Sequence, residues 1–133
     1  GWLQQHDRLL AAASQTQGIP LFLNGDLHSL GVGHIHRSRS ADLGDNPVHT
    51  LLTGPVGTGS RGWPSDARGT PGLPPGPLEV DEELSCLEQN GFTVIDFHRN
   101  RIEAQLFAWN RQDGPDEILS LQPVHRTVLE PRS

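Results

Sequence analysis

The hydrophobic and polar positions in the first part of the chain predict a helix followed by a short strand. The segment Trp2–Gln17 carries apolar residues at roughly helical spacing, and Gly18 followed by Pro20 ends this pattern as a C-terminal helix break does. The apolar positions of the expected helix are Leu3, Leu9, Leu10 and Ala13. The next segment, Pro20–Asn24, is too short for a helix and apolar on both faces, which indicates an interior strand of a covered sheet.

The middle of the chain predicts two strands and then a long irregular segment. Leu30–Ile35 and Val48–Thr53 have the apolar content and length of strands. Gly54–Leu78 is so rich in Gly and Pro that no regular element can persist in it, and long loops in compact domains are usually functional or disordered. An acidic patch, Glu79–Glu83, follows the loop, and we expect a short helical turn through Leu87.

The last third of the chain predicts a β-hairpin. Gly91–His98 and Arg101–Trp109 alternate between apolar and polar residues with period two, and the residues between them leave room for a tight turn in which Asn100 tolerates positive φ. A final strand within Ile118–Leu129 is expected to pair near this hairpin. The predicted class is therefore α+β, mostly β with one N-terminal helix.

Composition limits both the size of the core and the classes of partner. Among 133 residues, 34% are hydrophobic, 15 are Gly and 11 are Pro, which leaves apolar material for only a small core. A net charge of -6 argues against coating of nucleic acid or of an anionic membrane, and no apolar run is long enough to span a bilayer. The single Cys86 excludes an internal disulfide and a thiolate zinc knuckle. All the basic residues are Arg, a bias that favours a high-GC bacterial source.

The candidate chemistry is concentrated where the first expected strand ends. The strand runs into Gly25-Asp26-Leu27-His28, which places a carboxylate and an imidazole on a tight turn. A metallohydrolase presents ligands to metal ions in this way, since carboxylate oxygens and imidazole nitrogens are both good metal donors. The sequence therefore makes metal-dependent hydrolysis the first functional hypothesis.

The order of the elements and this motif resemble the C-terminal third of the calcineurin-like metallophosphoesterases, in the branch of the alkaline phosphatase D-like enzymes, whose last metal motif is Gly-Asp-x-His. The resemblance implies a four-layer αββα sandwich. The family's earlier motifs, which include Asp-x-His and Gly-Asn-His-Asp, would precede Trp2. We therefore expect the chain to be a C-terminal fragment of such a domain, to need the missing N-terminal part as its partner, and to be inactive alone. Its expected parts are 1–53 (helix, strands and metal motif), 54–78 (loop) and 79–133 (acidic turn and hairpin region).

The resemblance also implies hydrolysis of a small phosphate ester by two divalent or trivalent metal ions, for which Mn, Fe, Zn and Ca are candidates. Two adjacent cations neutralise phosphate charge and lower the pKa of a bound water toward ~7. His28 would ligate one metal, and Asp26 would either ligate the second or orient a ligand or a water. The alternative is that Asp26 only caps the turn and that His28 is an ordinary polar surface residue.

A second histidine motif competes with the first. Gly33-His34-Ile35-His36 is by letter the commoner superfamily form Gly-His-x-His, and two histidines spaced by two residues on a strand share one face and could chelate one ion. It is not preceded by a full strand and turn, so it is the poorer positional match. The alternative is a histidine pair that faces solvent or lines the cleft without a metal. The other histidines are expected to be structural: His6, His49, His98 and His125.

The Gly/Pro-rich loop offers candidates for substrate binding. It lacks the Gly-Lys-Ser/Thr ending of a P-loop, so we expect it to cover the metal cleft, with Arg61 or Arg68 binding a substrate oxyanion and Trp63 shaping the pocket. A packed or disordered surface loop is the alternative for each of these residues. For the chain as a whole, the alternative function is a non-catalytic β-rich module or a truncated product without activity of its own.

Overall fold

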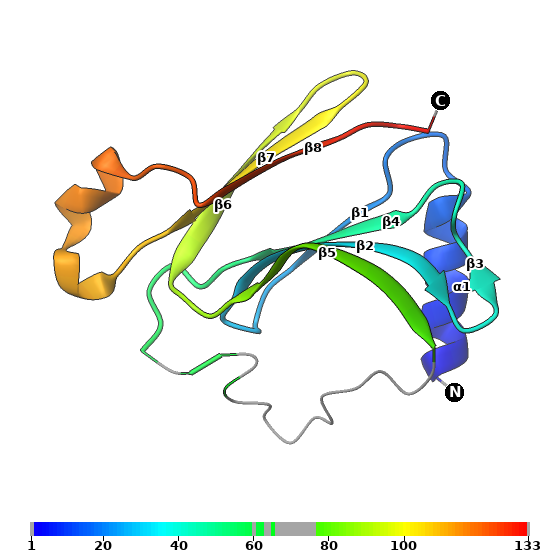
Figure 1. Cartoon of the computed structure of the whole chain (residues 1–133), viewed down its shortest axis with the longest axis horizontal. Helices are drawn as coiled ribbons and strands as arrows, with labels where there is room; N and C mark the ends of the chain where they lie inside the picture. The colour runs from blue at the N-terminus through cyan, green and yellow to red at the C-terminus, as the bar shows by residue number, and fades with distance from the viewer. Residues whose placement is uncertain (1, 60, 63–64, 66–76, 133) are drawn as a thin grey trace.

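The chain forms one α-helix and eight strands in the part that the computed structural model describes, residues 2–59, 61–62, 65 and 77–132 (Figure 1). The helix is α1 (Trp2–Ser14). The strands are β1 (Leu21–Asn24), β2 (Leu30–Ser38), β3 (Ala41–Asp42), β4 (Val48–Thr53), β5 (Leu78–Leu87), β6 (Gly91–Phe97), β7 (Ile102–Ala108) and β8 (His125–Leu129). Two short 3-10 helices, η1 (Arg111–Asp113) and η2 (Pro115–Ser120), connect β7 to β8. The architecture is thus α+β and mostly strand.

The strands form two sheets. The large sheet has the order β1-β4-β2-β3, and β5 pairs with β2 as well. Only β1 and β4 pair in parallel, and the other pairs in this sheet are antiparallel. The small sheet is an antiparallel meander in the order β6-β7-β8. Since β1 pairs only with β4, its carboxyl end lies at one edge of the large sheet.

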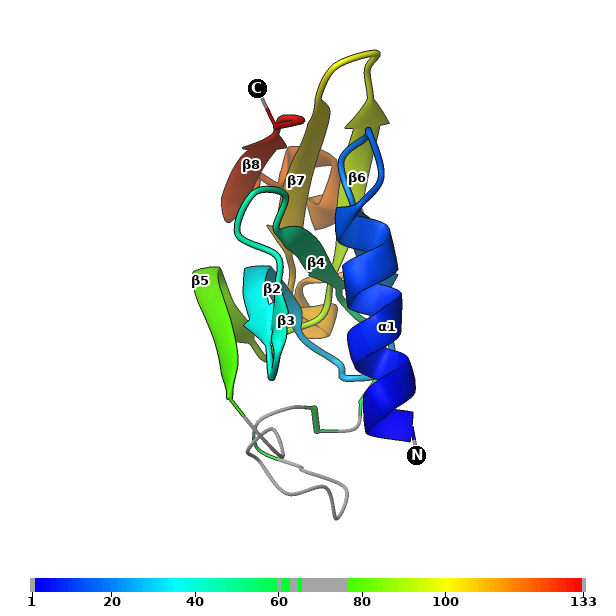
Figure 2. The same cartoon turned by 90° about the vertical axis from the view of Figure 1, so that its right-hand side faces the viewer.

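Two apolar clusters lie on opposite faces of the large sheet. One cluster fills the space between the two sheets and consists of Leu30, Val32, Leu51, Ala104 and Leu106. The other lies under α1 and consists of Leu10, Leu43 and Val48. Because side chains alternate between the faces of a strand, Val48 and Leu51 of β4 point in opposite directions. Helix, large sheet and small sheet therefore form three layers, and Figure 2 shows α1 beside the sheet that contains β2 and β4.

Most of the predicted elements are confirmed. The helix begins as expected and ends at Ser14, and the strands expected after residues 29, 47, 90 and 100 are β2, β4, β6 and β7. Leu78 was expected in the loop but begins β5. No described helix is long and apolar enough to cross a membrane.

Three local predictions are wrong. The strand in Pro20–Asn24 is an edge strand with Leu23 about half exposed, not an interior strand, because α1 and β4 cover it only in part. The acidic turn expected from Glu79 is the start of the ten-residue strand β5, whose acidic side chains are tolerated on the exposed outer strand of the sheet. The final strand is shorter than expected, since residues 118–120 belong to η2 and only His125–Leu129 pair with β7.

Candidate functional site

The turn that follows β1 holds its two polar side chains in an unusual backbone conformation. The Leu27 amide donates to the Gly25 carbonyl at 2.9 Å, which closes a γ-turn centred on Asp26 with φ of 67°. His28 also has positive φ, 53°. Among the described residues only one further non-glycine residue has positive φ, and each such residue costs about 1–3 kcal/mol. A turn of this kind presents its side chains in directions that an ordinary strand-to-strand connection would not give.

His28 lies between this turn and the Gly/Pro-rich loop. Its Nδ1 is 3.3 Å from the backbone carbonyl of Arg61, and because a carbonyl only accepts, Nδ1 carries the hydrogen. The loop also approaches through Gly62, where an added Cβ would lie 2.5 Å from the His28 carbonyl and 2.7 Å from the His28 Cβ. Only glycine allows this approach of one backbone to another. The loop is therefore seated against the candidate ligand.

A polar cleft of about 520 Å³ opens beside His28. Its walls come from the turn after β1, from Thr58 and Gly59 of the loop, from the β5–β6 connection and from η1 after β7. The β5–β6 connection contributes Glu88 and Asn90, and η1 contributes Arg111. Four segments that are distant in sequence thus meet at one concave surface, which is the usual setting of a binding site.

Glu88 connects the cleft to the loop. Its carboxylate accepts a hydrogen bond from the Gly62 amide at 2.7 Å and another from the Ser65 amide at 3.2 Å. Hydrogen bonds from Ser65 and Gly62 hold the pKa of Glu88 below its usual value, with a smaller contribution from the charge of Arg61. The negative charge of Glu88 is thus directed mainly at loop amides.

The remaining candidates from the sequence have different positions. Asp26 is exposed on the turn and is not among the described residues that line the cleft. Arg61 is also exposed and outside that lining, and it contributes to the site through its backbone carbonyl. Arg68 and Trp63 lie outside the described residues, so their role in substrate binding stays a prediction.

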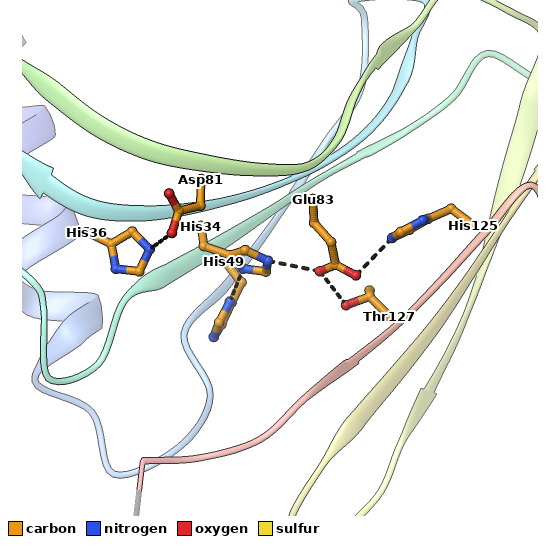
Figure 3. A network of polar contacts seen from close by, with 7 residues as sticks. All are labelled: His34, His36, His49, Asp81, Glu83, His125 and Thr127. Carbon is orange, nitrogen blue, oxygen red and sulfur yellow. Dashed lines mark hydrogen bonds and ion pairs between the residues drawn. The ribbon is translucent and has the colours of Figure 1, made fainter.

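The second histidine motif lies on β2 and forms a separate polar network (Figure 3). His34 Nε2 is 2.9 Å from a carboxylate oxygen of Glu83 on β5, and His34 Nδ1 is 2.7 Å from Nδ1 of His49 on β4. His36 Nε2 lies 2.9 Å from a carboxylate oxygen of Asp81. The two histidines share one face of β2, as the spacing predicts, but each contacts its own carboxylate and they do not converge on a common point.

Glu83 joins the two sheets at this network. Besides His34, its carboxylate accepts the Thr127 hydroxyl at 2.8 Å and a hydrogen bond from His125 Nε2 at 2.9 Å, both from β8 of the small sheet. Burial raises the pKa of Glu83, but the hydrogen bonds from Thr127, His34 and His125 outweigh this effect and hold it below its usual value. The carboxylate is therefore ionised at neutral pH and acts as a three-fold acceptor between the sheets.

His49 is neutral at the inner end of this network. Burial, and then the neighbouring His34 and His36, lower its pKa from 6.5 to about 4. The Nδ1 atoms of His34 and His49 face each other at 2.7 Å, so one ring donates to the other, and the Nε2 of His34 lies at 2.9 Å from Glu83. His49, His34 and Glu83 thus link β4, β2 and β5 by hydrogen bonds.

Sequence reasoning missed the importance of Glu83 and Arg111. Glu83 was hidden in an acidic run, although its place in a period-two pattern with Asp81 would have put both carboxylates on one face of a strand. Arg111 lies three residues after the end of β7, and no sequence signal connects it with His28, since 83 positions separate the two. Only the packing of the small sheet on the large sheet brings the two segments together.

The described residues contain no group of three or more His, Cys, Asp or Glu side chains arranged to hold a metal ion. Asp26 and His28 have the donor types that a metal prefers, but they are two ligands. Comparison with known proteins found no matching family model, no matching curated protein and no matching solved structure.

Proposed function

We propose that this chain forms one wall of the active site of a metal-dependent phosphoesterase, with Asp26 and His28 as its metal-ligand motif. One observation carries the proposal: His28 extends from a backbone turn with positive φ at the carboxyl end of β1 into a polar cleft. In open α/β sheets, ligands commonly bind outside the carboxyl ends of parallel strands, and β1 pairs in parallel with β4. The three layers of helix and two sheets are compatible with part of a four-layer αββα sandwich.

The hydrogen bonding of His28 fits a metal ligand. Metal-bound histidines usually donate their second ring N–H to a carbonyl or a carboxylate, which fixes the ring and its tautomer. His28 donates from Nδ1 to the Arg61 carbonyl, and a neutral ring with this tautomer has its lone pair on Nε2. Seating of the Gly/Pro-rich loop against the turn thereby orients the candidate ligand.

Asp26, on the same turn, would bind a second cation or orient a water. The γ-turn fixes its backbone, and an exposed carboxylate two residues before the histidine is a hard oxygen donor for a cation or for a water. Metal ions at such a site polarise the phosphoryl group and make a bound water acidic. The remaining ligands would come from the segment that the family resemblance places upstream, so the chain by itself is expected to bind metal weakly.

The test is a kinetic comparison of two histidine variants in the complete protein. His28→Ala should lower metal-dependent turnover of an aryl phosphate by roughly a hundredfold or more, because it removes a metal ligand. His98→Ala is the matched control, since His98 is exposed in the β6–β7 turn and should leave turnover unchanged. Urea unfolding of both variants shows whether either change acts through the fold.

Three results would contradict the proposal. Full activity of His28→Ala at saturating Mn²⁺ or Zn²⁺ would remove His28 from the metal site. Absence of metal-dependent turnover in the complete protein, with Mn²⁺, Fe²⁺, Zn²⁺ and Ca²⁺ each supplied, would favour the non-catalytic β-rich module. Loss of folding in His28→Ala would assign the residue a structural role.

A further inference from the structure

The cleft beside His28 contains one strong cation. Arg111 is the only Arg among the described residues that line it, and the chain has no Lys. Arg111 makes no ion pair with any residue that the structure describes, whereas Arg37, Arg39 and Arg101 each pair with a carboxylate. A guanidinium directed to a polar cleft without an internal carboxylate partner has its charge available for a ligand.

The local structure holds Arg111 at this position. Asn110 precedes η1 and accepts the Gln112 amide with its side-chain oxygen at 3.1 Å, which fixes the start of the short helix. The Trp109 indole, just before it, donates to the Val56 carbonyl at 2.9 Å and so ties this segment to the loop. The guanidinium reaches Gly59, where an added Cβ would lie only 2.9 Å from Arg111 Nη1. Because Gly59 has no side chain, the Arg111 guanidinium can occupy the space beside it.

The other charged side chain of the cleft, Glu88, forms no ion pair with Arg111 among the described residues. Glu88 directs its carboxylate to the Gly62 and Ser65 amides. The rest of the lining is mostly uncharged and polar, including Thr58, Asn90 and Gln112. The cleft therefore combines one guanidinium, one carboxylate already bound by the loop and several neutral hydrogen-bonding groups, and the guanidinium is the group that suits a small, hydrophilic oxyanion.

We propose that Arg111 binds the phosphoryl oxygens of the substrate in this cleft, beside the metal-ligand motif that contains His28. This inference deepens the proposed phosphoesterase function and rests on it for the identity of the substrate. A guanidinium offers two parallel N–H donors to a phosphate, which a single imidazole or hydroxyl cannot do. Because Arg111 binds the group both before and during reaction, it acts mainly on affinity. The substrate-binding Arg is thus the one on η1, in place of Arg61 of the loop.

The first experiment measures binding of inorganic phosphate by NMR, with sodium chloride at matched ionic strength as the blank. Phosphate should shift the amide resonances of Gly59 and Arg111, and Arg111→Gln should weaken its binding about tenfold, as expected for loss of a charge-assisted bidentate contact. Arg99→Gln is the matched control, because Arg99 lies in the β6–β7 turn, about 23 Å from the cleft end of β6 at the usual rise per residue. Unchanged affinity in Arg111→Gln, or shifts at another surface, would overturn the proposal.

A second variant tests the same contact without removing the charge. Gly59→Ala should displace the flexible guanidinium at little cost in stability and weaken phosphate binding in the same direction. In the complete enzyme, Arg111→Gln should raise KM about tenfold with kcat little changed. These readouts separate the two proposals. Phosphate binding that depends on Arg111 in a protein without esterase activity would keep the anion site and reject the function. An inactive His28→Ala variant together with an unaffected Arg111→Gln variant would keep the function and reject this site.

Discussion

Glu83 is expected to be the most important polar side chain for holding the two sheets together. Its carboxylate accepts hydrogen bonds from Thr127 and His125 of β8 and from His34 of β2 (Figure 3). Glu83→Ala would leave these three donors without their acceptor. Thr127 is only 6% exposed, so water is a poor replacement for the carboxylate as the acceptor of its hydroxyl hydrogen.

The magnitude follows from the number of bonds and from their exposure. A hydrogen bond to a charged group contributes about 1.5–3 kcal/mol, but the Glu83 side chain is one third exposed, so water compensates part of the loss. We therefore expect Glu83→Ala to lower the free energy of unfolding by about 2–4 kcal/mol. The matched control is Glu82→Ala, the neighbouring exposed position of β5, which should cost less than about 0.5 kcal/mol.

The assay is urea unfolding followed by tryptophan fluorescence, with the slope m compared between variants. An unchanged m with a lower midpoint indicates a change in stability rather than in the compactness of either state. Equal effects of Glu82→Ala and Glu83→Ala would contradict this role of Glu83, because both changes alter strand propensity alike and, in the described part of the chain, Glu82 accepts only the exposed Ser85 hydroxyl. Double mutants that combine Glu83→Ala with Thr127→Val should show non-additivity of about 1 kcal/mol.

Two further predictions concern the pH dependence of stability and the contact of the loop with the His28 turn. The pKa of His49 falls from 6.5 to about 4 on folding, so the unfolded state binds more protons between these values and stability should fall as pH drops from 6.5 to 4. The whole shift corresponds to about 3.4 kcal/mol, and partial exposure of the ring reduces the expected loss to about 1–2 kcal/mol. Urea unfolding at pH 7 and pH 5 should show this loss of stability in the parent protein and in the control variant His98→Gln, but not in His49→Gln. An equal loss in all three proteins would show that His49 is not its source. Gly62→Ala should separate the loop from the turn that contains His28, because the added Cβ would meet the His28 backbone. We expect lower turnover of the complete enzyme, measured by steady-state kinetics, with little change in the free energy of unfolding in urea. Wild-type kinetics in this variant would show that the loop does not orient His28.

The elements with clear periodicity could be predicted from the sequence. The helix from Trp2 and the hairpin strands after residues 90 and 100 depend on local patterns, namely apolar spacing and period-two alternation. The strand β5 could not be recognised in this way, because its pairing with β2 contains register shifts and its acidic residues resemble a solvated turn. Its stability comes from contacts with β2 and β8 that are distant in sequence.

The sequence predicted the turn that carries Asp26 and His28 but not which segments form the cleft beside it. A motif of four consecutive residues placed Asp26 and His28 on a turn after a strand, and the structure places them there. The cleft itself depends on where the β5–β6 connection and η1 meet this turn, and no local pattern contains that information. For the same reason, Gly62 could be recognised as a loop glycine but not as the residue that contacts the backbone of His28.

We infer that the turn after β1, and not the histidine pair on β2, binds the metal. The most direct measurement is paramagnetic broadening of the histidine side-chain NMR signals by substoichiometric Mn²⁺ in the complete protein. The His28 signal should broaden first, while the signals of His34 and His36, which contact Glu83 and Asp81, should persist at the same Mn²⁺ concentration. Broadening of His34 and His36 at a concentration that leaves His28 sharp would contradict it.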